Sequence, residues 1–426
     1  MLNMVGVGPF LTIPLAIAAM GGPQAMVGWV LGALLCLCDG MVWAELGSAM
    51  PNSGGSYTYL QEAFGKRGLG QPMSFLFLWQ TLLTGPIGIA TGAVGFSQYL
   101  SFIYPQLPHS GLLAVAVGVC LANVFLLYRN IRSIDRISVA MTAIVVATFG
   151  WVIISGAVRF HPAMAFDFAP GAFHMSRPFW IGLGATTLIA VYDYGGYNNV
   201  CLLGGEIEQP QKNIPRAVIL SIVLVGVLYL LMNLSILGSL DWRIAEQSQA
   251  VVADFMQVVD GRWAGVLVSI LVLVISFGSV FANLLGYSRI PYAAAVDGRF
   301  FHVFARLHET EGFPTLSLLF MGVASSIACL FSLSELIKVL IVVQAIFQFG
   351  AQCVAVELMR RRNRDAKSYR MPLYPLPAAI ALLGWIYIAA SSGGRYVALA
   401  LVMAVVGTGI YLIKAKYERE WPFAAL

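Results

Sequence analysis

Long apolar stretches, separated by short polar segments, occupy most of the 426-residue chain. The stretches repeatedly reach the roughly 20 residues that an α-helix needs to cross the hydrocarbon core of a bilayer. The pattern predicts a first, broken span that ends near Ala19, followed by spans at 24–47, 72–101, 110–128, 134–158, 179–204, 215–240, 262–287, 314–332, 335–357, 374–391 and 395–413. We therefore expect an all-α polytopic membrane protein with twelve transmembrane helices.

The lysines and arginines support this division of the chain, because cytoplasmic loops of membrane proteins retain positive charge. If the N-terminus lies in the cytoplasm, 19 of the 25 basic residues fall in predicted cytoplasmic loops. The six on the other side are Arg159, Arg177, Arg243, Arg262, Lys338 and Arg395. We expect a multi-pass protein embedded in the lipid bilayer of the plasma or inner membrane, with both termini in the cytoplasm. The net charge of +5 follows from this topology and indicates no nucleic-acid partner.

Glycines interrupt two of the apolar stretches, at residues 5–10 (VGVGPF) and 192–197 (YDYGGY). In the first, Pro9 lacks an N–H group and disfavours helical geometry at Gly8. Inside a bilayer, the backbone leaves the helix only where its N–H and C=O groups contact protein or a water-filled cavity. A pair of such breaks at matching positions of two halves is the best sequence indication of a transporter's binding site.

The spans divide the chain into two units of five spans each, 1–158 and 179–357, with two further spans in 372–413. An odd number of spans per unit places the two units in opposite orientations in the membrane, which is the inverted-repeat architecture. The longest connections, among them 241–261, have roughly 20 residues. We therefore expect no separate soluble domain.

The first break offers groups for both ends of a zwitterion. The N–H groups at the start of the second helical piece, around Pro9 to Thr12, and the positive end of its dipole favour a carboxylate. The carbonyls that end the first piece, near Met4 and Val5, favour an ammonium group or a cation. A glycine hinge or a helix-packing notch would explain one break, but two breaks at matching positions favour a binding site.

Several motifs follow one another along the chain: Ala44-Glu45-Leu46-Gly47 through Pro51, Ser53-Gly54-Gly55-Ser56-Tyr57, Gly204-Gly205-Glu206 through Asn213-Ile214-Pro215-Arg216-Ala217, and Ser288-Arg289, Ala294-Ala295 and Asp297-Gly298-Arg299. Together they resemble the amino acid–polyamine–organocation transporter family over nearly the whole chain. The resemblance implies a five-plus-five inverted repeat of the leucine-transporter (LeuT) type with helices 1 and 6 broken. It also implies a substrate site between helices 1, 3, 6, 8 and 10.

The resemblance implies roles at the two breaks. Gly6-Val7-Gly8 stands where the family usually has Gly-Ser-Gly, Tyr192 at the aromatic residue that gates the substrate from outside, and Gly195 at a carbonyl that binds the amine. Because Val7 has no hydroxyl, backbone N–H groups alone must bind a carboxylate. The expected substrate-binding residues are Met4, Val5, Gly6, Val7, Gly8, Pro9, Phe10, Tyr192, Asp193, Tyr194, Gly195 and Gly196.

The coupling devices that the resemblance implies are not intact. The coupling lysine of helix 5 is missing, since 137–158 contains no charged residue. Sodium-dependent relatives place two adjacent hydroxyls on helix 8, whereas Ser276 and Ser279 are not neighbours. We therefore expect transport that does not require sodium.

Two acidic residues are the candidates for proton coupling. Asp39 shares a helical face with Gly28 and Gly32, a G-x-x-x-G pattern typical of close helix packing, so it should point into the bundle. A charge there costs about 2.5–3.5 kcal/mol, so Asp39 needs a partner or a proton. Its position six residues before Glu45 resembles an extra glutamate of the polyamine–proton symporter branch. The alternative is a packing residue that is protonated or hydrogen-bonded.

Asp193 lies inside the second break, where the family usually has a small residue. It can pair with a substrate ammonium group or titrate during transport, or it can cap the second helical piece. Toward the cytoplasmic ends of the spans, we interpret Glu45, Glu206 and Arg289 as an inner gate or structural pairs. Gln344 and Gln348 are candidate polar residues of the pocket, or ties between helices.

These features predict a secondary active transporter, a permease that moves amino acids across the cytoplasmic membrane by alternating access with proton-coupled uptake. Polyamine or organocation symport, amino acid exchange, and a non-transporting amino acid sensor are the alternatives. We expect no enzyme, cofactor or metal site. All five histidines lie in predicted loops, and Cys36 and Cys38 lack further ligands; the six cysteines fall inside spans, where we expect free thiols.

Overall fold

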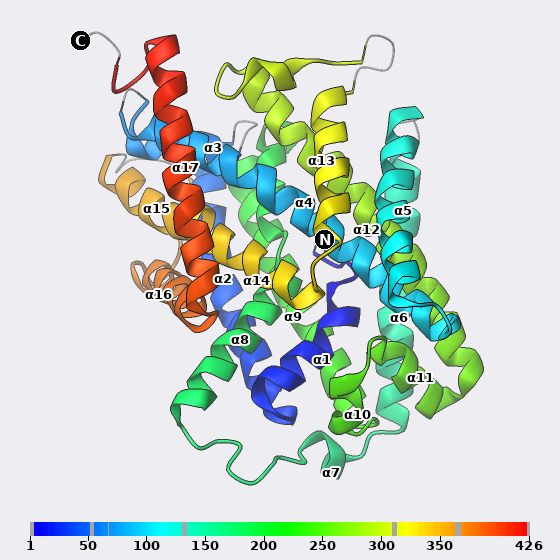
Figure 1. Cartoon of the computed structure of the whole chain (residues 1–426). Helices are drawn as coiled ribbons and strands as arrows, with labels where there is room; N and C mark the ends of the chain where they lie inside the picture. The colour runs from blue at the N-terminus through cyan, green and yellow to red at the C-terminus, as the bar shows by residue number, and fades with distance from the viewer. Residues whose placement is uncertain are drawn as a thin grey trace.

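The structure is a computed structural model that describes residues 4–51, 55–66, 68–129, 134–308, 313–362 and 368–423. Within these ranges it consists of helices joined by short connections and contains no β-strand (Figure 1). The prediction of an all-α chain is therefore confirmed.

The first half of the chain begins with a short helix and continues with four long ones. Its elements are α1 (Gly8–Met20), the 3₁₀ turn η1 (Pro23–Ala25), α2 (Met26–Ala49), α3 (Ser56–Phe64), α4 (Gly70–Ile103), α5 (His109–Arg129), α6 (Ile134–Val158) and α7 (Pro162–Ala165).

The second half again alternates long and short helices. Its elements are α8 (Arg177–Tyr194), the 3₁₀ helix η2 (Tyr197–Glu206), α9 (Pro210–Leu237), α10 (Trp242–Gln247), α11 (Val251–Asp260), α12 (Arg262–Val296), η3 (His302–Ala305), α13 (Thr315–Ala328), α14 (Leu333–Gln344), the π-helical segment η4 (Ala345–Phe349), α15 (Gly350–Arg362), α16 (Leu376–Ser391) and α17 (Gly394–Glu418).

Eight helical segments in the described residues are long and apolar enough to cross a membrane, which supports an integral membrane protein. Three shorter apolar helices, α1, α13 and α16, lie at further predicted spans. With 13 residues, α1 is only about 20 Å long, whereas the hydrocarbon core measures about 30 Å. Among the described residues, eight helical segments thus have the length and apolar composition of a full span, where the hydropathy pattern predicts twelve.

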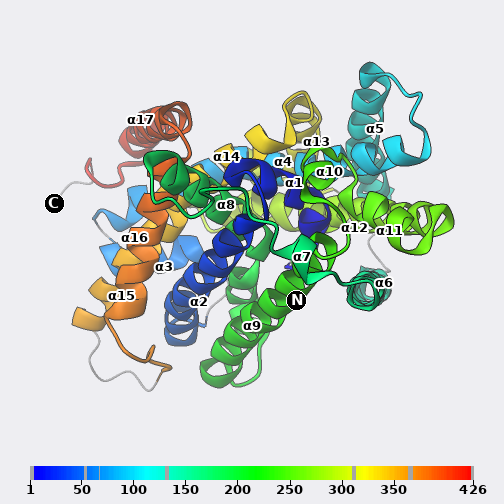
Figure 2. The ribbon, with the colours of Figure 1, turned by 90° about the horizontal axis from the view of Figure 1, so that it is seen from below.

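The predicted connection 241–261 is largely helical, because it contains α10 and α11. One face of α11 buries Val251, Val252 and Phe255, so its apolar residues pack against the bundle although the helix is too short for a span. Figure 2 shows α7, α10 and α11 on the lower face of the molecule. The sequence pattern also did not predict α3, which buries Tyr59 and Leu60.

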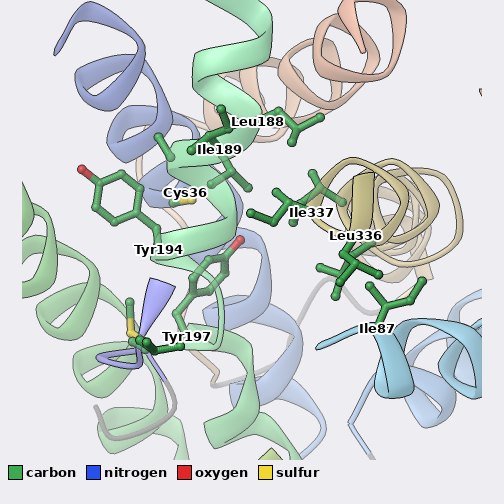
Figure 3. Close-up of a cluster of buried hydrophobic side chains, with 14 of the residues drawn as sticks. Cys36, Ile87, Leu188, Ile189, Tyr194, Tyr197, Leu336 and Ile337 are labelled. Carbon is green, nitrogen blue, oxygen red and sulfur yellow. The ribbon is translucent and has the colours of Figure 1, made fainter. Parts of the chain in front are cut away.

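Glycines on α2 bring that helix directly against α8. A Cβ atom added at Gly28 would lie 2.5 Å from Cγ2 of Thr186, and one at Gly32 would lie 2.7 Å from Cβ of Ala190. The G-x-x-x-G face therefore packs as the sequence predicts. Further along the same interface, Figure 3 shows Cys36 of α2 beside α8, whose Leu188 and Ile189 belong to the same core.

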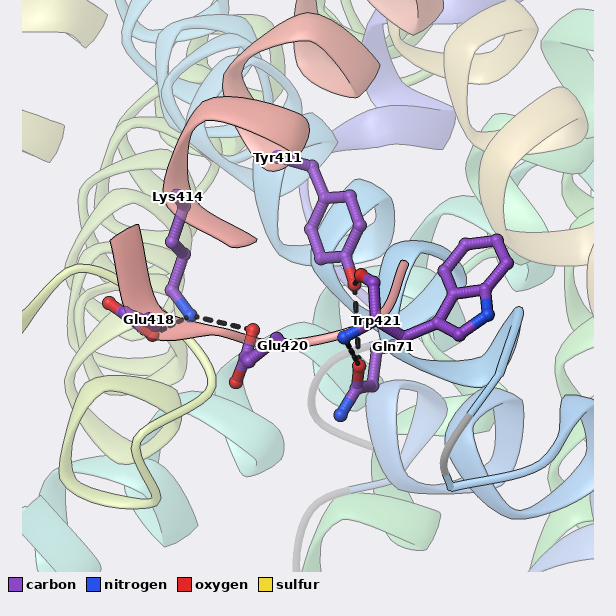
Figure 4. A network of polar contacts seen from close by, with 6 residues as sticks. All are labelled: Gln71, Tyr411, Lys414, Glu418, Glu420 and Trp421. Carbon is purple, nitrogen blue, oxygen red and sulfur yellow. Dashed lines mark hydrogen bonds and ion pairs between the residues drawn. The ribbon is translucent and has the colours of Figure 1, made fainter. Parts of the chain in front are cut away.

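The end of α17 is tied to the start of α4 by a polar network (Figure 4). Lys414, only 7% exposed, forms ion pairs with Glu418 and, at 3.2 Å, with Glu420. The Trp421 N–H donates a hydrogen bond to Oε1 of Gln71 at 3.1 Å. The two glutamates compensate the charge of a lysine that would otherwise be costly to bury.

Candidate functional site

The first predicted break lies where α1 begins. Residues 4–7 form a turn and bends, and the helix starts at Gly8, with Pro9 in its first turn. Pro9 suits this position because a helix leaves its first N–H groups without intrahelical partners. The N–H of Phe10 donates to the Val7 carbonyl at 3.1 Å.

The second predicted break separates α8 from η2. The α-helix ends at Tyr194, and Gly196 has a φ of +101°, in the left-handed region that favours glycine. The chain then continues from Tyr197 as a 3₁₀ helix. The interruption occurs at the predicted residues, although its second piece is a 3₁₀ helix rather than an α-helix.

The two breaks border the same cavity, which has a volume of about 200 Å³. Residues of α2, α3, α4, α6, α12, α14, η2 and η4 also line it. The predicted site residues that line it are Met4, Val5, Gly6, Val7, Gly8, Pro9, Tyr192, Asp193, Gly195 and Gly196. Segments about 187 residues apart in the sequence thus meet at one site.

Two predicted site residues, Phe10 and Tyr194, are not among the residues that line the cavity. The Phe10 ring packs against Phe149, with 4.7 Å between the ring centroids. The Tyr194 ring stacks on Tyr229 at 5.7 Å, and its hydroxyl donates to the Trp29 carbonyl at 3.3 Å. Both side chains belong to the packing behind the breaks.

Asp193 points from α8 to the beginning of α1. Its side chain is 3% exposed, and its Oδ2 accepts a hydrogen bond of 2.5 Å from the Thr12 hydroxyl. Its Oδ1 has no partner among the described residues and would lie 2.3 Å from a Cβ atom added at Gly8. The side chain does not cap η2, so the predicted alternative of a helix cap is not realised.

Tyr192 and the Met4 carbonyl have partners within the protein. The Tyr192 hydroxyl donates to Oγ1 of Thr91 on α4 at 2.8 Å, which links the second break to the opposite wall. The Met4 carbonyl, predicted to face an ammonium group, accepts a hydrogen bond of 2.7 Å from the Tyr229 hydroxyl. One of its two lone pairs is therefore already engaged.

Polar residues of α4 form a wall that we did not single out from the sequence. Gln80, Thr84 and Thr91 line the cavity, and Nε2 of Gln80 lies 3.4 Å from Oε1 of Gln348. Their spacing, together with Gly88, places them on one face of the helix. A polar face within an apolar stretch is the sequence pattern from which these residues could have been predicted. The predicted Gln344 and Gln348 also line the cavity.

Asp39 is fully buried and lies one side chain behind the cavity wall. The Tyr197 hydroxyl donates to its Oδ2 at 2.6 Å, and Nε1 of Trp385 donates to its Oδ1 at 2.9 Å. Tyr197 itself lines the cavity, as does Trp43. The Cys353 thiol of α15 donates a weaker hydrogen bond to Oδ1 at 4.0 Å. Asp39 thus points into the bundle as predicted, and three hydrogen-bond donors meet its carboxyl group.

At the far end of α2, Glu45 is paired with Arg360 of α15. The guanidinium contacts both carboxylate oxygens, at 2.5 and 2.6 Å, and the Met371 N–H donates to Oε2 at 2.8 Å. Arg289 is exposed. The arginine that pairs with Glu45 is therefore Arg360, which the sequence analysis did not single out. The Glu206 side chain lies outside the described residues.

Comparisons with known proteins agree with this architecture. The family model described as "Amino acid permease" matches residues 2–412. The chain belongs to the amino acid permease family. The resemblance to amino acid–polyamine–organocation transporters is thereby confirmed.

Curated relatives of the permease are themselves transporters. It is 26% identical over 405 residues to the serine/threonine exchanger SteT of Bacillus subtilis (strain 168), covering 92% of this chain and 88% of SteT. It is 30% identical over 326 residues to the large neutral amino acids transporter small subunit 2 of Mus musculus, covering 75% of this chain. The match spans 60% of the length of that mammalian relative. These names agree with the expectation that the permease is not an enzyme.

Proposed function

We propose that this permease is a secondary active transporter that moves amino acids through the cavity between the two breaks by alternating access. The observation that carries the proposal is that both glycine breaks, at 5–10 and 192–197, border one cavity inside a member of a permease family. Broken helices at a midplane cavity are the usual binding sites of such transporters, since their free backbone groups bind the charged ends of a substrate.

Within this proposal, the permease has two inverted units, 1–158 and 179–357, followed by helices in 372–413. The count of twelve spans combines the eight long helices with the shorter α1, α13 and α16 and with α8 continued by η2. Both termini then lie in the cytoplasm. The positive-inside distribution of lysine and arginine supports this orientation.

Substrate binding is assigned to backbone groups of the first break and to Tyr192, Asp193, Gly195 and Gly196 at the second. Uptake is coupled to protons through the two buried acids, Asp193 at the cavity and Asp39 behind it. The position of Asp39 supports this role, because Tyr197 lines the cavity and donates a hydrogen bond to the Asp39 carboxyl group. Polyamine uptake, amino acid exchange and a sensor without transport remain the competing functions.

Flux through proteoliposomes tests the proposal with a pair of matched variants. Gly88 lines the cavity on α4, whereas nothing lies within 4 Å of a Cβ atom added at Gly118 on α5. Gly88→Leu should reduce uptake of a radiolabelled amino acid by at least about tenfold, because its side chain fills space that the substrate needs. Gly118→Leu should leave uptake unchanged.

The experiment also separates a carrier from a sensor. Uptake driven by a pH gradient supports proton symport, and uptake that requires amino acid on the inside supports exchange. Binding of amino acids to the purified protein without any flux would contradict transport and favour the sensor. Equal uptake by wild type and Gly88→Leu would contradict the placement of the substrate in this cavity.

A further inference from the structure

The π-helical segment η4 forms part of the cavity wall, and its last two residues, Gln348 and Phe349, line the cavity. A π-helix joins an N–H to the carbonyl five residues earlier, and here the Gly350 N–H donates to the Ala345 carbonyl. A Cβ atom added at Gly350 would lie 2.9 Å from that carbonyl oxygen, so the glycine permits the turn. Such turns inside α-helices are rare and are frequently found at functional sites.

The Phe349 ring separates the cavity from Trp385 of α16. The two rings are stacked, with 4.4 Å between their centroids and 8° between their planes. Trp43 of α2 packs edge-on against the Phe349 ring at 6.3 Å. Trp385 is 1% exposed and is not among the residues that line the cavity. A displacement of Phe349 must therefore move the indole of Trp385 or break the stack.

The same indole contacts Asp39. Nε1 of Trp385 donates to Oδ1 of Asp39 at 2.9 Å, whereas the Tyr197 hydroxyl donates to Oδ2. The Cys353 thiol, which also donates to Oδ1, lies four residues after Phe349 in the chain. Tyr197 thus connects the cavity to one carboxyl oxygen of Asp39. Both donors to the other oxygen are connected to η4, one by ring stacking and one through the backbone of α15.

We propose that Phe349 is a positioning residue for proton coupling: a substrate that contacts Phe349 moves the stacked Trp385 and so determines whether the indole N–H reaches Oδ1 of Asp39. A π-helical turn suits this role, because an α-helical turn of the same segment is a second discrete arrangement. The inference rests on the proposed function, in which Asp39 carries the proton. It adds the path by which a substrate in the cavity changes the binding of that proton.

The groups around Asp39 assign a pH effect to its own carboxyl group. The titratable side chains that face it are Tyr197 of η2, Cys353 of α15, and Cys36 and Cys38 of α2. Thiols and phenols titrate at much higher pH than a carboxyl group. The neighbouring helix α16 contains no charged residue. Charged residues of the other elements that pack on α2 have other surroundings: Asp193 bonds to Thr12, Glu45 pairs with Arg360, and Lys212 and Arg216 are exposed.

The pH dependence of uptake in proteoliposomes, at saturating substrate, tests the inference with two variants. Trp385→Phe keeps a ring for the stack and removes the indole N–H. Its uptake profile should shift to higher pH by about one unit, because the ionised carboxyl group of Asp39 loses a donor. Phe349→Leu keeps an apolar side chain without the ring and should shift the profile in the same direction. The double variant should shift it no further than Trp385→Phe alone, since both changes act on one hydrogen bond.

Trp263→Phe is the matched control, because it makes the same substitution in a stacked pair, Trp151 and Trp263, whose centroids lie 5.9 Å apart. Trp263 is 63% exposed, and its variant should keep the wild-type profile. A wild-type profile in Phe349→Leu, or additive shifts in the double variant, would overturn the inference. Phe349→Leu alone decides the question if Trp385→Phe does not fold.

The outcomes separate this inference from the proposed function. Unshifted profiles in both ring variants leave proton coupling through Asp39 intact and remove only the path through Phe349. If uptake by the wild type does not depend on pH, the inference and proton coupling fail together. Transport through the cavity is then still decided by the comparison of Gly88→Leu with Gly118→Leu.

Discussion

At the scale of single residues, the site depends on a close fit between Gly8 and Asp193. The glycine begins α1, and the space that a side chain would occupy is filled by Oδ1 of Asp193 and, at 3.3 Å, by Cε1 of Tyr192. Gly8 therefore has two functions: it ends the irregular segment before the helix, and it lets the acid of α8 approach the helix end.

Gly8→Ala should disrupt this contact, because its Cβ atom would lie 2.3 Å from Oδ1 of Asp193. We expect ligand affinity to fall by at least about tenfold, measured by equilibrium binding to the purified protein. The control is Gly118→Ala on α5, where a Cβ atom meets nothing within 4 Å. Unchanged affinity in Gly8→Ala would mean that Asp193 does not need this position to bind the ligand.

The sequence revealed the glycines and acids of the site, because glycine breaks and charges are conspicuous in apolar stretches. It did not reveal the partners, since these come from distant helices. Nothing near Asp39 in the sequence points to Tyr197 or Trp385, which donate its hydrogen bonds. Likewise, the hydroxyl and amide groups of α4 become part of the cavity only through the packing of the bundle.

At the scale of elements, α2 connects three parts of the molecule. Its glycines pack on α8, Asp39 lies behind the cavity, and Glu45 at its far end binds Arg360 of α15. The Glu45 side chain is 7% exposed and that of Arg360 is 23% exposed. The pair is therefore more shielded from water than a surface ion pair, and removing one partner leaves a poorly hydrated charge.

Glu45→Gln should destabilise the permease, because Arg360 loses a carboxylate that contacts it with both oxygens. Breaking a buried pair costs about 3–5 kcal/mol, and the partial exposure of Arg360 favours the lower end. The measurement is the apparent Tm in detergent. Glu357→Gln is the matched control, since its i,i+4 pair with Arg361 is exposed and worth about 0.3–0.5 kcal/mol. Similar Tm values for both variants would refute the structural role of the Glu45 pair.

Long apolar helices were easier to predict than short helices. Long apolar stretches predicted the positions of α2, α4, α5, α6, α9, α12 and α17 to within a few residues at most ends. In contrast, α10 has only six residues, and α3 and α11 are short and amphipathic, so that their burial depends on the bundle beneath them. The end of α12 at Val296 was also missed, because the predicted span stops where the apolar stretch ends.

At the scale of the whole molecule, the buried carboxyl group of Asp39 joins α2 to three other elements, because a third, weaker hydrogen bond comes from the Cys353 thiol of α15. It lies on α2, accepts a hydrogen bond from Tyr197 at the start of η2, and accepts another from Trp385 on α16. Movement of η2 against α2 would change the number of donors that this carboxyl group has. A change in donors alters whether the ionised or the protonated form is favoured, which is how a buried acid can couple proton binding to a conformational change.

Asp39→Asn removes this titration while keeping the size of the side chain and an acceptor oxygen for Tyr197 or Trp385. We expect accumulation driven by a pH gradient to collapse to the level of equilibration in proteoliposomes, because the variant cannot carry the proton. Ligand binding should survive, since Asp39 does not line the cavity. Tyr197→Phe separates the proton from the hydrogen bond: it keeps the acid but removes one donor, so it should shift the pH dependence of uptake rather than abolish it. An unchanged pH profile in Asp39→Asn would show that Asp39 is a hydrogen-bonded packing residue, and that exchange or another acid drives transport.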